Sequence, residues 1–115
     1  MNNIHRLAIW CLALAILGDV PAFAASAENG KIAFTKNGCW QCHGFAGQGS
    51  IATSGGTVLT GTALSYDAFE SFVRNSNGPM PPYRAAILSD ADLADIYAYL
   101  KSIPKQDPNG IPLLK

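Results

Sequence analysis

The stretch Cys39-Trp40-Gln41-Cys42-His43 decides how this chain folds. It places two thiols three residues apart and an imidazole directly after the second thiol. This arrangement is the attachment signal of a covalently bound c-type haem, because each thiol can add across one vinyl group of the porphyrin. The adjacent imidazole is then held under the iron. We therefore expect Cys39 and Cys42 to carry a haem and His43 to be its first axial ligand.

Three other chemistries use cysteines at this spacing. A zinc site takes four Cys or His ligands, and the chain after residue 24 offers only Cys39, Cys42 and His43. A thioredoxin-like redox pair is expected in a βαβ context, which the sequence lacks. A structural disulfide would leave the adjacent histidine unexplained. Haem attachment is the interpretation that uses all three residues.

The sixth iron ligand is expected from Gly78-Pro79-Met80-Pro81-Pro82-Tyr83, called the Met80 strap below. Its three prolines fix φ and favour extended geometry in the residues before them, so Met80 is carried on a stiff segment. Apart from Met1 it is the only methionine. A histidine and a thioether together saturate haem iron and raise its potential, which suits electron transfer. A lysine, a backbone group or an open position are the alternatives.

The first 24 residues have the pattern of a signal peptide. A short segment ending in Arg6 precedes an uninterrupted apolar run over residues 7–17, and Ala22-Phe23-Ala24 predicts cleavage after Ala24. An uncleaved anchor is the alternative, but at ~1.5 Å per residue the run spans about half of a ~30 Å hydrocarbon core. We expect a periplasmic protein with no membrane span after cleavage. The predicted organisation is a signal peptide (1–24), one domain (25–104) and an irregular tail (105–115).

Composition limits the remaining classes of function. The chain has 115 residues, which argues for one domain, and 8 basic residues balance 8 acidic ones. A net charge of zero gives no reason to expect nucleic acid as a partner. With 49% hydrophobic residues the chain can form a core, so disorder is not expected.

Three helices are predicted, over residues 25–36, over residues 66–75 and from Ser89 to the proline at position 104. Ser26, Ser65 and Ser89 are suited to cap them. Apolar residues recur at helical spacing within each: Ala27, Gly30, Ala33 and Phe34; Phe69, Phe72 and Val73; Leu93, Ile96, Leu100 and Ile103. Residues 43–61 carry six glycines and predict a loop. No strand pattern is present, so the fold class is all-α.

The haem motif, the Met80 strap and the segment 88–101 together resemble the small bacterial class I c-type cytochromes. The resemblance covers nearly the whole domain, 25–104. It implies the cytochrome c fold, in which three main helices and loops wrap around one covalently attached haem. It also implies that the first and last helices cross at near right angles. Four residues would meet at this crossing: Gly30, Phe34, Ile96 and Tyr99.

The same resemblance implies haem c attached through Cys39 and Cys42, with the iron ligated by His43 and Met80. One departure concerns the proximal histidine. Family members commonly carry Gly-Pro-x-Leu, and the proline carbonyl accepts the other N–H of the imidazole. This chain has Gly56-Thr57-Val58-Leu59 instead. The sequence therefore leaves the acceptor for His43 unassigned.

The function implied is that of a periplasmic single-haem electron carrier, which is not itself an enzyme. It would act as a soluble carrier or as the cytochrome subunit of a dehydrogenase or oxidase complex. The expected partners are redox proteins, with a periplasmic dehydrogenase as donor and an oxidase or another cytochrome as acceptor. A haem enzyme or gas sensor with an open iron position, and a non-haem thiol module, are the alternatives.

Overall fold

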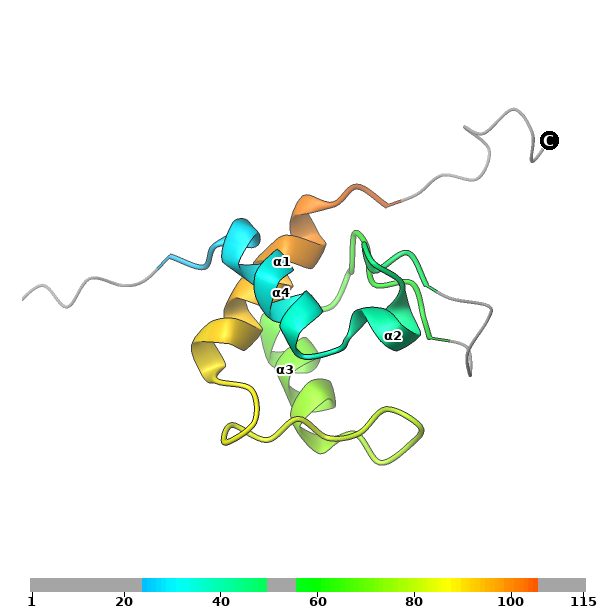
Figure 1. Ribbon diagram of the computed structural model, residues 1–115, viewed down its shortest axis with the longest axis vertical. Coiled ribbons are helices and arrows are strands. Elements are labelled where there is room, and N and C mark those ends of the chain that lie inside the picture. The colour runs from blue at the N-terminus through cyan, green and yellow to red at the C-terminus, as the bar shows by residue number, and fades with distance from the viewer. Residues whose placement is uncertain (1–23, 50–55, 106–115) are drawn as a thin grey trace, which may run out of the picture.

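The computed structural model describes residues 24–49 and 56–105, and this part of the chain is helical without strands (Figure 1). In chain order the helices are α1 (Ala27–Lys36), α2 (Trp40–His43), α3 (Tyr66–Asn75) and α4 (Asp90–Ser102). The predicted all-α class is confirmed. The predicted signal peptide, apart from Ala24, and the tail after residue 105 lie outside the described residues.

Each of the three longer helices begins directly after a serine that caps it. The side-chain oxygen of this serine accepts a hydrogen bond from the backbone N–H three residues further on, which satisfies one of the free donors at the helix start. The three pairs are Ser26 with Asn29 (3.2 Å), Ser65 with Ala68 (3.3 Å) and Ser89 with Asp92 (3.1 Å). The predicted caps are confirmed, although α1 begins two residues later than expected.

Helix α2 is a single turn that the sequence did not predict as a helix. Gly38 adopts φ +74° after the end of α1, a conformation that glycine reaches without steric cost. The backbone N–H of His43 then donates to the carbonyl oxygen of Cys39 at 3.0 Å. One turn is too short to show an apolar period, so periodicity could not reveal it. It carries Cys42 and His43, and Cys39 directly precedes it as the N-cap.

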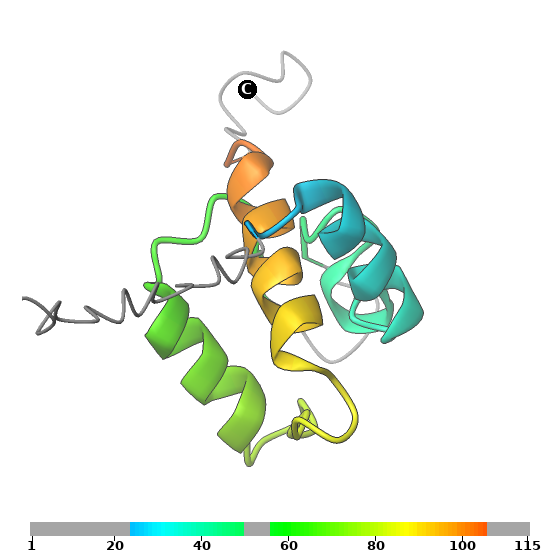
Figure 2. The same ribbon diagram turned by 90° about the vertical axis from the view of Figure 1, so that its left-hand side faces the viewer.

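Helix α4 lies between α1 and α3 (Figure 2). The rings of Phe34 and Tyr99 pack with their centroids 5.7 Å apart, and Ile96 is buried in the same core. The predicted meeting of α1 and α4 through Gly30, Phe34 and Tyr99 is confirmed. The buried apolar side chains are Ala33, Phe34, Phe69, Val73, Leu88, Leu93, Ile96, Tyr99 and Leu100.

Phe72 shares a helical face with Phe69 and Val73, as predicted, but it is 60% exposed while the other two are buried. All three side chains border the first of the two cavities described below, and Phe72 also borders the second. This face of α3 therefore lines the cavities as well as the core.

The close approach of α1 and α4 depends on Gly30. A methyl group at this position would overlap the backbone carbonyl of Asp95 and approach Cβ of Tyr99. In an exposed helix, Gly→Ala would stabilise by about 1 kcal/mol. Here we expect Gly30→Ala to reduce the free energy of unfolding by roughly 1–3 kcal/mol, because the helices must separate.

Guanidinium unfolding of the purified protein measures this change. Asn29→Ala is the matched control, because Asn29 is the exposed neighbour of Gly30 on α1; it should stay within about 0.5 kcal/mol of wild type. If Gly30→Ala were as stable as this control, the proposed packing at the crossing would be incorrect.

Candidate haem site

A cavity of about 590 Å³ is walled mainly by apolar side chains of α3, α4 and the segment 57–64. Cys39, His43 and Met80 all border it. Cofactor sites typically measure ~300–1,000 Å³ and combine apolar walls with a few polar groups. The cavity therefore has the size and lining of a site for a large, flat, apolar cofactor.

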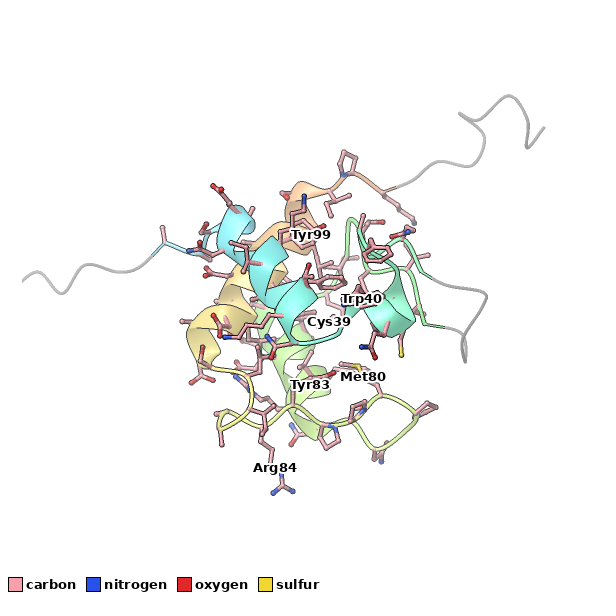
Figure 3. All side chains as sticks on the ribbon, in the orientation of Figure 1. Cys39, Trp40, Met80, Tyr83, Arg84 and Tyr99 are labelled. Atoms are coloured by element: carbon pink, nitrogen blue, oxygen red, sulfur yellow. The ribbon has the colours of Figure 1, made fainter. Side chains whose placement is uncertain are left out.

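A second cavity of about 220 Å³ adjoins the first and contains the remaining predicted site residue, Cys42. The two cavities share six lining residues: Cys39, His43, Thr57, Phe72, Met80 and Tyr83. Figure 3 shows Met80 on its strap next to Cys39 and the haem motif. The structure thus brings all four predicted residues around one pair of adjoining cavities.

The imidazole of His43 is oriented by a backbone carbonyl. Its Nδ1 lies 2.9 Å from the carbonyl oxygen of Thr57. Because a carbonyl oxygen only accepts, Nδ1 must carry the ring proton in this bond, and Nε2 keeps a free lone pair. This is the arrangement in which a histidine binds a metal through Nε2. The acceptor that the sequence left unassigned is therefore Thr57, through its main chain.

The segment carrying Thr57 is fastened to the haem motif by close backbone packing. The N–H of Leu59 donates to the carbonyl oxygen of Gly47 at 2.7 Å, and the N–H of Gly49 donates to that of His43 at 2.8 Å. Gly56 lies so close to the backbone of Cys42 that a Cβ atom would overlap the Cys42 carbonyl. This packing explains why a threonine can replace proline here: the carbonyl is positioned by its neighbours.

Gly56→Ala should therefore damage the site. The added methyl group forces the segment away from Cys42 and draws the Thr57 carbonyl off His43. We expect a loss of roughly 1–3 kcal/mol in the free energy of unfolding. The reduction potential should rise, because an imidazole without this hydrogen bond is a weaker electron donor.

Chemical unfolding and a redox titration of the variant measure both effects. Gly78→Ala is the matched control, since a Cβ at Gly78 would meet nothing within 4 Å. Equal behaviour of the two variants would contradict the role assigned to Gly56.

Cys39 and Cys42 form no disulfide with each other. Burial raises the pKa of the Cys39 thiol to about 11, with a backbone hydrogen bond opposing the rise and Cys42 adding to it. Cysteines that exchange disulfides need a lowered pKa, in the range of roughly 3.5–7.5, so that the thiolate is present at neutral pH. The raised pKa argues against the thioredoxin-like alternative.

The far end of the Met80 strap is attached to two helices. The Tyr83 backbone N–H donates to the carbonyl oxygen of Val73 at 2.9 Å, and its hydroxyl donates to that of Asn37 at 3.3 Å. Burial raises the pKa of the Tyr83 phenol, which stays protonated at neutral pH. Tyr83 could not be predicted as a positioning group, because its hydroxyl reaches a carbonyl 46 residues away in the chain.

Residues 25–100 match the family model described as cytochrome C oxidase, cbb3-type, subunit III. The chain belongs to this family. It is therefore a c-type cytochrome domain, which binds haem and transfers electrons. This agrees with the resemblance to small class I cytochromes. A search of the curated proteins finds no match.

Two further findings concern the cytochrome domain. In the part of the chain that the structure describes, no helix is both long and apolar enough to cross a membrane. The same residues contain no group of three or more His, Cys, Asp and Glu side chains that could hold a metal ion. The ligating side chains at the two cavities are the thiols of Cys39 and Cys42, the imidazole of His43 and the thioether of Met80, and an imidazole with a thioether is a ligand pair that binds haem iron.

Proposed function

We propose that this chain is a periplasmic cytochrome with one covalently attached haem c, which passes single electrons between redox proteins. Cys39 and Cys42 would form the thioether links, and His43 and Met80 would be the axial ligands. The protein would work as a soluble carrier or as the cytochrome subunit of a dehydrogenase or oxidase complex. The family description, which names an oxidase subunit, supports the oxidase alternative.

The observation that carries this proposal is the position of His43 and Met80 on the same cavity of about 590 Å³. They come from different parts of the chain, one from α2 and the other from the strap after α3. An iron held by both would have no position left for a substrate or gas. This favours electron transfer over bond chemistry.

The bound haem would supply a one-electron iron couple, and the chain's residues would adjust it. The Thr57 carbonyl fixes the ring orientation and raises the basicity of His43. The apolar walls, including Leu59, Leu93 and Leu100, limit access of water and lower the local dielectric constant. Electron transfer changes only the oxidation state of the iron and breaks no covalent bond. The site therefore needs no general acid or base.

The test is to express the full chain, with its own N-terminal segment, in a bacterium that assembles c-type cytochromes. We expect a red protein in the periplasmic fraction that titrates as a single one-electron couple and binds no carbon monoxide when reduced. Ready binding of carbon monoxide would indicate the haem enzyme or gas sensor instead. A colourless protein would indicate the non-haem thiol module.

A further inference from the structure

Arg74, near the end of α3, joins three separate groups that follow Met80 in the chain. Its Nη1 donates to the carbonyl oxygens of Tyr83 at 2.8 Å and Leu88 at 2.6 Å. Its Nη2 donates to the Asp90 carboxylate at 2.5 Å. The side chain is only 13% exposed. One guanidinium thus connects α3, the end of the Met80 strap and the start of α4.

The part of the strap that carries Met80 has little support of its own. Within the described chain, residues 77–82 take part in no hydrogen bond. The first fixed point after Met80 is Tyr83, whose N–H is bound by Val73 and whose carbonyl is bound by Arg74. Two consecutive residues of α3 therefore hold both backbone groups of Tyr83, three residues from the thioether.

We propose that Arg74 is the positioning residue for Met80, and that its contacts set how firmly the thioether stays at the iron. This inference rests on the proposed ligation by Met80. Hydrogen bonds from a guanidinium are charge-assisted and roughly twice as strong as neutral ones. Without these hydrogen bonds the backbone carbonyl of Tyr83 is no longer held. The Met80 strap then moves away from the iron more often. Each opening exposes the sixth iron position to small ligands.

The planar fork of arginine matters as well as its charge. Two donors of fixed geometry reach the Tyr83 and Leu88 carbonyls and the Asp90 carboxylate together. The ammonium group of a lysine is a single point on a flexible stem and cannot reproduce this geometry. Arg74→Lys should therefore behave like Arg74→Gln, although it keeps the positive charge.

The experiment measures the rate at which imidazole binds to the oxidised holoprotein, because binding requires Met80 to leave the iron. We expect Arg74→Gln and Arg74→Lys to bind imidazole about tenfold faster than wild type, as a local opening becomes more frequent. The absorption band of the thioether–ferric bond should also disappear at a lower temperature, while the helical circular dichroism persists. Rates equal to wild type in both variants would overturn the proposal.

Two controls separate positioning from general stability. Arg84→Gln removes an arginine whose side chain extends away from the body of the molecule (Figure 3), and it should bind imidazole at the wild-type rate. Gly30→Ala weakens the α1–α4 contact but removes none of the Arg74 hydrogen bonds, so it should accelerate imidazole binding much less than the Arg74 variants do. An equal acceleration in Gly30→Ala would overturn the role of Arg74. If wild type lacked the thioether band, the Met80 ligation itself would be refuted, and this inference with it.

Discussion

Met80→Ala is expected to open the iron to external ligands and to lower its reduction potential on the order of 0.1 V or more, within the ~0.8 V range that axial ligands control. Among the described residues, Met80 carries the one thioether that borders the cavity. Its sulfur favours the reduced iron, so a variant without it should favour the oxidised form. A spectroelectrochemical titration and carbon monoxide binding to the reduced protein measure the two effects.

Met80→Leu is the matched variant, because it keeps most of the apolar volume against the core but removes the sulfur. If ligation is the role of Met80, both variants should show the lower potential and bind carbon monoxide. If Met80 only packs against the core, Met80→Leu should resemble wild type. An unchanged spectrum and potential in both variants would show that another group is the sixth ligand.

The double variant Cys39→Ala/Cys42→Ala is expected to lose all covalently bound haem. No other attachment point exists in the predicted mature chain, which has only these two cysteines. A domain of about eighty residues buries a modest fraction of its surface, so it commonly needs a cross-link or a bound cofactor to be stable. Without the attached haem, the apolar side chains that line the cavity of about 590 Å³ would be exposed to water. We therefore expect little folded protein to accumulate.

Acid–acetone extraction followed by haem staining of a denaturing gel measures the attachment directly. The wild-type band should stain and the double variant should not. Cys11→Ala is the control, since Cys11 lies in the predicted signal peptide and its loss should leave the stain unchanged. Haem that survives on the double variant would mean that the thiols are not the attachment points.

The features predictable from sequence are those fixed over a few residues. The serine caps depend on an N–H three residues away, so Ser65 and Ser89 located the starts of α3 and α4 correctly. The haem motif and the Met80 strap carry their chemistry in consecutive residues. For the same reason, Cys39 and Met80 could be predicted as site residues from the sequence alone.

What the sequence could not supply are contacts between distant segments. Thr57 acts through its carbonyl, which every residue possesses, so the sequence showed its place in the Gly56-Thr57-Val58-Leu59 run but not its contact with His43. Asp95 accepts a hydrogen bond from the backbone N–H of Ser26 at 2.6 Å across 69 residues. Arg74 depends on carbonyls nine and fourteen positions away.

The most direct measurement is the intact mass of the denatured protein recovered from the periplasm. A covalent c-type cytochrome predicts the mass of the processed chain plus one haem, retained after unfolding because thioether bonds survive denaturation. A polypeptide mass without any porphyrin would contradict the central claim, that a tethered haem is the core of this molecule.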